Sequence, residues 1–228
     1  MSLRFSIIIT ILSLTIFGFT LKKNKLNDPE KEKVLLEIVK YVVERGHYNS
    51  IDLDDNFSVK IFDDFISKLD PQKRFFTVND IRQLNRYKYK IDDQIKNYQL
   101  EFFEETYKTY NLRLSDAKLF VDKVFETDFD FSEDEFIDLN NDSIPFSSGK
   151  NQLFERWRKQ IKYSVLDILT QRYSSDSLDF NEIKINAIST VKKNTDDFFD
   201  YANELDRDDW FSVFVLSLIH ISEPTRPV

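Results

Sequence analysis

The chain has 228 residues, with 40 Asp and Glu against 32 Lys and Arg, a net charge of -8 and no cysteine. The lack of cysteine excludes disulfides, thiolate zinc sites and cysteine nucleophiles, and two histidines and three glycines leave little for a histidine-based site or a glycine-rich phosphate loop. The acidic balance argues against a nucleic-acid partner bound through its phosphates, and we expect no cofactor. Because Gly and Pro are scarce among 32% charged and 41% hydrophobic residues, we predict an all-α fold of long helices.

The N-terminal residues 5–21 form an apolar stretch that follows Arg4 and precedes Lys22, Lys23 and Lys25. This pattern is typical of a signal peptide. The stretch is long for one, has no A-x-A cleavage site and is followed at once by lysines, so an uncleaved membrane anchor is the main alternative and a buried core helix a third. Either leading interpretation predicts that residues 1–21 direct export, to the periplasm or to the inner membrane with the body facing the periplasm.

The first helix of the body is expected from Asp28, where a capping side chain is followed by Pro29 and the acidic Glu30. Apolar residues then recur at helical spacing from Val34 onwards, and Gly46 marks the end of the helix. His47 follows directly, and a histidine there favours contact with the last helical carbonyls over a role as base or ligand.

A second helix is predicted over residues 55–69, and the Asp70-Pro71 pair ends it because proline disfavours a helical residue before it. Phe75 and Phe76 should form a short extended piece. Thr77 and Asp80 then match a weakened capping box that opens a third helix.

The rest of the body is expected to contain four further helical regions. Residues 98–126 predict one long helix or two stacked ones, residues 127–148 a polar loop, and residues 150–173 and 180–205 further helices. The acids of residues 206–209 should cap a last helix that begins near Trp210. Trp157 and Trp210 lie on apolar helix faces, which favours core packing over a ligand platform.

Three polar patterns are candidate sites of chemistry. The alternating acids of 128–132 resemble the start of a calcium loop, but the sixth position is Glu133 and the twelfth Leu139, where Gly and Glu are needed. Carboxylate doublets at 92–93, 196–197 and 208–209 favour solvated helix faces, because adjacent helical residues point about 100° apart. The basic and aromatic stretch 82–90 is best explained by ion pairing along a helix. We therefore expect no catalytic, cofactor or metal residue.

Four segments carry a family resemblance: residues 34–48, 65–81, 153–162 and 208–215. They resemble the N-terminal helical region of tail-specific proteases, also called carboxy-terminal processing peptidases. The most specific piece is the Leu-Asp-Pro sequence with two following phenylalanines. The residues that carry the motif are Leu69, Asp70, Pro71, Phe75, Phe76, Trp157, Arg158 and Trp210.

The resemblance implies an exported serine endopeptidase with a PDZ module and a Ser/Lys dyad, which cleaves polypeptide substrates recognised through apolar C-termini. None of the positions that carry that chemistry lies within residues 1–215. The resemblance therefore implies that residues 22–215 are a noncatalytic N-terminal scaffold. This scaffold would shape access to the peptidase and offer a docking site for an adaptor protein, with the membrane met only through the N-terminal segment.

The C-terminal residues 216–228 are expected to be foreign to the protein, since residues 216–227 resemble the translation of a transposon-end adapter used in sequencing libraries. The native sequence would then continue differently after Val215. A natural polar tail is the alternative. It corresponds to a second hypothesis for function, a stand-alone exported helical module that binds a protein partner.

Overall fold

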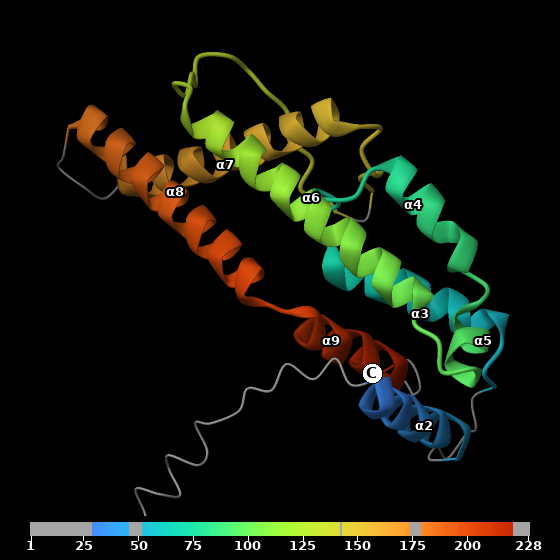
Figure 1. Cartoon of the computed structure of the whole chain (residues 1–228). Coiled ribbons are helices and arrows are strands. Elements are labelled where there is room, and N and C mark those ends of the chain that lie inside the picture. Colours follow the sequence, from blue (N-terminus) through green and yellow to red (C-terminus); the bar gives the residue numbers. More distant parts are fainter. Residues whose placement is uncertain (1–28, 46–51, 142, 174–178, 221–228) are drawn as a thin grey trace, which may run out of the picture. The chain divides into compact units, whose positions relative to one another are not determined.

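The computed structural model describes residues 29–45, 52–141, 143–173 and 179–220 (Figure 1). The chain divides into two units, residues 1–33 and 34–228, and the second contains the hydrophobic core. Within the described residues there are eight α-helices, one short 3-10 helix and no strand, which confirms the all-α prediction. The predicted signal or anchor segment, His47 and residues 221–228 lie outside the described residues.

The helices match most of the expected ranges. They are α2 (Pro29–Arg45), α3 (Asp55–Leu69), α4 (Val78–Leu84), the 3-10 helix η1 (Asn85–Tyr87), α5 (Ile91–Lys96), α6 (Glu101–Phe125), α7 (Lys150–Tyr173), α8 (Phe180–Glu204) and α9 (Arg207–His220). The region predicted as one or two helices is the single helix α6. The last helix begins three residues before Trp210 and continues past Val215.

Short side chains fix where these helices begin. The Asp54 carboxylate accepts a hydrogen bond of 2.9 Å from the Phe57 N–H and so caps α3. Asp179 caps α8 by accepting from the Asn181 N–H. The Asp206 carboxylate accepts from the first N–H groups of α9, which confirms the predicted cap. Each cap satisfies backbone donors that have no partner within the helix, and contributes about 1 kcal/mol.

Helix α6 contacts α4, α7, α8 and α9 and supplies the centre of the hydrophobic core (Figure 1). Phe102 and Phe103 near its start are fully buried, and both rings meet those of Phe65 from α3 and Phe214 from α9. A fully buried side chain of this size stabilises a fold by about 1.5–3 kcal/mol. This aromatic cluster therefore joins α3, α6 and α9.

Helix α7 packs against α6 and α8 through a stripe that recurs every four residues. Both ends of the stripe are buried, from Leu153 through Trp157 to Leu169. Spacing of four keeps side chains on one helix face, and this face is turned to the core. The prediction that Trp157 and Trp210 pack in the core is confirmed, since their exposed fractions are 2% and 9%.

Two expectations about charged residues are wrong. The basic stretch 82–90 does not pair along one helix, because α4 ends at Leu84. Its ion pairs join different elements, Lys88 with Asp63 of α3 and Arg86 with Glu105 of α6. Asp92 does not lie on a solvated face: it is 3% exposed and accepts a hydrogen bond of 2.6 Å from Ser58.

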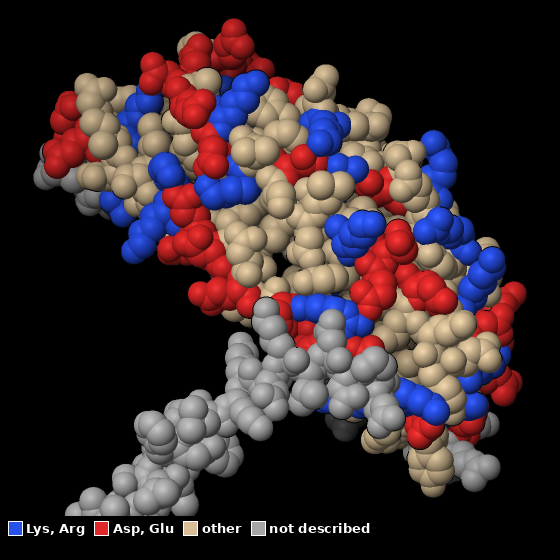
Figure 2. All heavy atoms as spheres, viewed as in Figure 1, with Lys and Arg blue, Asp and Glu red and all other residues tan. Residues whose placement is uncertain are grey.

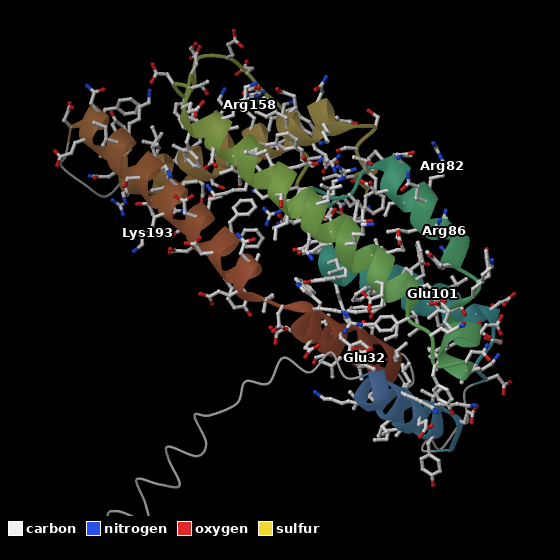
Figure 3. All side chains as sticks on the ribbon, viewed as in Figure 1. Glu32, Arg82, Arg86, Glu101, Arg158 and Lys193 are labelled. Carbon is white, nitrogen blue, oxygen red and sulfur yellow. The ribbon has the colours of Figure 1, made fainter. Side chains whose placement is uncertain are left out.

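The surface carries both signs of charge. Figure 2 shows acidic and basic side chains interspersed over the visible face. Arg82 and Arg86 point outward from α4 and η1 (Figure 3). In the part of the chain that the structure describes, no helix is both long and apolar enough to cross a membrane.

Candidate functional site

The motif residues 69–76 form a tight turn between α3 and α4 that is organised by Asp70. The Asp70 N–H closes α3 by donating to the Ile66 carbonyl at 3.0 Å. Its carboxylate accepts three backbone hydrogen bonds, from Arg74 at 2.7 Å, Phe75 at 2.9 Å and Phe76 at 2.8 Å. Asp70 is 2% exposed. One buried carboxylate therefore satisfies three N–H groups that the turn leaves without helical partners.

The turn needs one unusual backbone conformation. Lys73 has a φ of 50°, in the left-handed region that non-glycine residues rarely adopt. Its N–H donates to the Asp70 carbonyl at 3.1 Å. The hydrogen bonds around Asp70 hold this conformation in place. Pro71, at the start of the turn, is exposed.

Burial shifts the pKa values of the ionisable groups around the turn. It raises the pKa of Asp70 above its usual range, despite the three N–H donors and nearby Arg74. It lowers the pKa of the Arg74 guanidinium. It also raises the pKa of Tyr110 to about 12, with a further contribution from the Asp70 charge. The turn thus places opposite charges in a poorly solvated setting.

Aromatic rings surround the turn. The Phe75 ring meets Tyr110 at 5.4 Å and Trp157 at 5.6 Å between centroids, both edge to face. The Arg74 guanidinium lies 4.3 Å from the Trp157 ring centroid and 5.1 Å from that of Phe198. Such a guanidinium over aromatic faces is a cation–π contact. Residues from the turn, α6, α7 and α8 therefore meet at one place.

Hydrogen bonds connect the turn to helix α7 and to the segment before it. The Trp157 indole N–H donates to the Arg74 carbonyl at 2.9 Å. Arg156 donates to the carbonyls of Lys73 and, at 3.0 Å, Pro145. The Lys73 ammonium donates to the Ile144 carbonyl at 2.7 Å. These contacts join the turn to residues about 70 to 80 positions later in the chain.

A second buried carboxylate begins α4. The predicted capping box is complete, since Thr77 and Asp80 exchange side-chain to backbone hydrogen bonds. Arg113 of α6 donates to both Asp80 oxygens at 2.8 Å. Burial alone would raise the pKa of Asp80, but the hydrogen bonds from Arg113 and Thr77 outweigh it and the pKa is lowered. The Val78 N–H also donates to the Ser147 carbonyl at 2.8 Å.

Two motif residues lie away from this turn. Arg158 faces outward from α7 and pairs with Glu135 of the 126–148 loop (Figure 3). The Trp210 ring of α9 meets the Tyr110 ring edge to face, at 5.0 Å between centroids. The same Tyr110 ring also contacts Phe75. The structure therefore brings Leu69, Asp70, Phe75, Phe76 and Trp157 together, and connects Trp210 to them through Tyr110.

Two hollows open beside the turn. The loop-side hollow, about 240 Å³, lies between the turn, residues 136–144 and α7. The α8-side hollow, about 390 Å³, lies between the turn, α7 and α8. Both are lined by Gln72, Arg74 and Gln160. Sequence reasoning did not single out these three residues, because nothing in their local sequence signals that they meet.

The acids 128 and 130, which resemble the start of a calcium loop, do not gather into a metal site in the structure. Asp130 accepts hydrogen bonds from the N–H and hydroxyl of Ser132. Over the described ranges, no three His, Cys, Asp or Glu side chains are grouped so that they could hold a metal ion.

Comparison with known proteins shows the family of this chain. The family described as "Tail specific protease N-terminal domain" matches residues 38–224. The chain belongs to this family. The match includes all the motif residues and confirms the resemblance to tail-specific proteases. It also extends past Val215, and the assignment of residues 216–228 to an adapter stays a prediction.

A curated relative agrees with this assignment. The tail-specific protease of Haemophilus influenzae is 23% identical over 153 residues, which cover 65% of this chain. The same match covers 22% of that protease's length. Together with the family match, this identifies the chain as an N-terminal part of a tail-specific protease.

Proposed function

We propose that this chain is the noncatalytic scaffold of an exported serine endopeptidase that processes polypeptides from their C-terminal end. A PDZ module and a Ser/Lys dyad, encoded beyond the matched region, would recognise and cleave the substrate. In such a dyad a buried, neutral lysine takes the serine proton. The family match over residues 38–224 is the observation that carries the proposal.

Buried polar contacts between the helices support a scaffold role. The Asp70 turn and the Asp80 cap tie α3 and α4 to α6 and α7 by buried hydrogen bonds and ion pairs. We infer that these buried polar contacts select one arrangement of the helices, a role that such contacts have in some other proteins. A preorganised domain loses little entropy when another domain or an adaptor protein binds to it.

The first test is to resequence the gene from genomic DNA across codon 215. We expect the reading frame to continue into a PDZ-like segment and then a serine and a lysine. A stop codon that ends the frame as written would overturn the proposal.

The second test is a cleavage assay on a peptide with an apolar C-terminus. We expect the 228-residue chain alone to leave the peptide intact and the full-length protein to cleave it. Alanine in place of the new serine should abolish cleavage. Cleavage by the 228-residue chain itself would contradict the noncatalytic role.

The alternative is a stand-alone exported module that binds a protein partner. The net charge of -8 favours it, because an acidic surface attracts a basic partner. Both proposals include export, which rests on the apolar residues 5–21. Cell fractionation tests it: we expect the protein in the periplasm or the inner membrane, and recovery in the cytoplasm would contradict export.

A further inference from the structure

Arg74 belongs to the walls of both hollows beside the turn. It lines both the loop-side hollow and the α8-side hollow, together with Gln72 and Gln160. Arg74 is partly buried, and the faces of Trp157 and Phe198 lie over its guanidinium. These rings cover the faces of the planar guanidinium. Its N–H donors lie on the edge of that plane, where they can bind an acceptor in the hollows.

The guanidinium has no ion-pair partner among the described residues. The nearby Asp70 carboxylate uses its oxygens on three backbone N–H groups and does not pair with it. The other cations of the loop-side hollow are engaged: Arg156 donates to carbonyls of residues 73 and 145, and Lys159 to that of Phe136. Three further acids line the two hollows, and none forms an ion pair with the guanidinium: Asp138, Glu155 and Asp167.

Gln72 lines the same hollows and also lacks, in the part of the chain that the structure describes, a partner for one of its polar atoms. Its side-chain oxygen is buried and has no hydrogen-bond partner among the described residues. A buried acceptor without a partner costs about 1–3 kcal/mol. Because that oxygen has almost no accessible surface, a ligand meets it only when the Gln72 side chain turns towards the hollow. Such a ligand must offer a donor to Gln72 and an acceptor, preferably anionic, to Arg74. A polypeptide offers both, through a backbone N–H and a carboxylate.

The walls indicate how such a ligand would lie. Besides the residues that they share, the loop-side hollow is lined by Ile144 and Phe136 and the α8-side hollow by Ile168 and Phe198. Phe136 is 79% exposed, so it offers apolar surface to a ligand in the loop-side hollow. A segment that crosses Arg74 and places a side chain in each hollow would present a side-chain carboxylate to Arg74, whereas a chain end would leave one hollow empty.

We propose that Arg74 and Gln72 form a binding site for an internal, extended polypeptide segment. An acidic side chain of the segment pairs with Arg74, its backbone N–H donates to Gln72, and its flanking apolar side chains fill the two hollows. The residues of the site lie between positions 72 and 198, so the proposal does not depend on the proposed function.

The test uses three capped peptides and the full 228-residue chain. The probes are acetyl-Phe-Asp-Leu-amide, acetyl-Phe-Asn-Leu-amide, and acetyl-Phe-Asn-Leu with a free C-terminus. Binding is measured by calorimetry. The two tryptophans give two indole N–H resonances, and the signal of Trp157, next to Arg74, should shift while that of Trp210 stays. We expect the Asp peptide to bind about tenfold more tightly than the Asn amide, which is the gain of one charge-assisted hydrogen bond.

Variants separate the two contacts. In Arg74→Met the tenfold preference for the Asp peptide should disappear, while the control Arg86→Met, an exposed arginine stacked on Tyr87 at 4.7 Å, should keep it. Gln72→Ala should weaken the Asp peptide and the Asn amide alike, by about fivefold, and keep the preference. If Arg74→Met does not fold, the Gln72 variant and the indole shifts still decide the question.

Three results would overturn the proposal. The first is equal affinity for the Asp and Asn amides, or no binding of either. The second is that the free C-terminus binds as tightly as the Asp side chain, which would make Arg74 a site for chain ends. The third is that Gln72→Ala leaves both affinities unchanged.

Discussion

The segment 70–80, which contains the turn and the start of α4, and the loop at residues 126–148 both contain carboxylates, which act in different ways. In the segment 70–80, Asp70 is 2% exposed and accepts hydrogen bonds from backbone N–H groups. Asp80 is 3% exposed and accepts from Arg113. In the loop, Glu135 is held near the surface by Arg158 and Lys162. Ion pairs at the surface contribute little, whereas a buried charge that loses its partner costs several kcal/mol. Exposure, more than charge, therefore decides how much each acid contributes to stability.

The largest effect is expected when Arg113 of α6 is removed. Arg113→Met leaves the buried Asp80 carboxylate without the donors that reach both of its oxygens. We expect a loss of about 3–5 kcal/mol in the free energy of unfolding, measured by urea denaturation. Arg158→Met, which removes the α7 partner of Glu135 in the loop, is the matched control and should cost less than about 1 kcal/mol. Equal losses in the two variants would contradict the comparison.

Asp70→Asn should come next. The amide keeps one oxygen as an acceptor, so at least one of the three N–H groups of residues 74–76 is left without its partner. The expected loss is about 1–3 kcal/mol in the free energy of unfolding. Asp138→Asn removes a comparable carboxylate that accepts from the Asn140 N–H at the exposed loop, and should change stability far less. A larger loss in Asp138→Asn would count against the role assigned to burial.

Trp157→Phe should have a smaller effect. Phenylalanine keeps an aromatic ring but loses the indole N–H that donates to the Arg74 carbonyl. We expect a loss of about 1 kcal/mol from the hydrogen bond, in addition to the lost ring area. The indole N–H of Trp210 has no partner among the described residues, so Trp210→Phe removes ring area without breaking a hydrogen bond and should cost less than Trp157→Phe. Identical losses would show that the Trp157 hydrogen bond contributes nothing.

Glu135→Gln should have the smallest effect, with a distinctive pH dependence. Hydrogen bonds from Arg158 and Lys162 lower the pKa of Glu135 from 4.5 to about 2. A lowered pKa means that the contribution to stability is full above pH 4.5 and is lost as the pH falls towards 2. We expect the variant to lose up to about 1 kcal/mol at pH 7 and nothing near pH 2. A difference that grows on acidification would contradict the assigned pairing.

The sequence was sufficient for the long elements. Apolar spacing and the Asp70-Pro71 pair predicted α3 at its observed bounds, and Thr77 with Asp80 predicted the start of α4. Helix α5 was not predicted, because six residues are too few to show a helical period. The burial of Asp92 was missed because its partner, Ser58, lies 34 residues away.

The candidate site was predicted only in part, for a similar reason. The family resemblance picked out Asp70, Phe75, Phe76 and Trp157, which the structure brings together. Arg74 carries no local signal that it will lie over the rings of Trp157 and Phe198, since both come from helices far along the chain. Gln72 and Gln160 likewise become neighbours only after α7 packs beside the turn.

The hydrogen bond from Trp157 to the Arg74 carbonyl also has a consequence for synthesis on the ribosome. It spans 83 residues, and a ribosome adds about 5–20 residues per second. Phe75 and Phe76 are therefore added to the chain about 4–16 seconds before Trp157. During that interval Phe75 cannot yet contact Trp157 or Phe198, and chaperone binding should concentrate at this pair of phenylalanines.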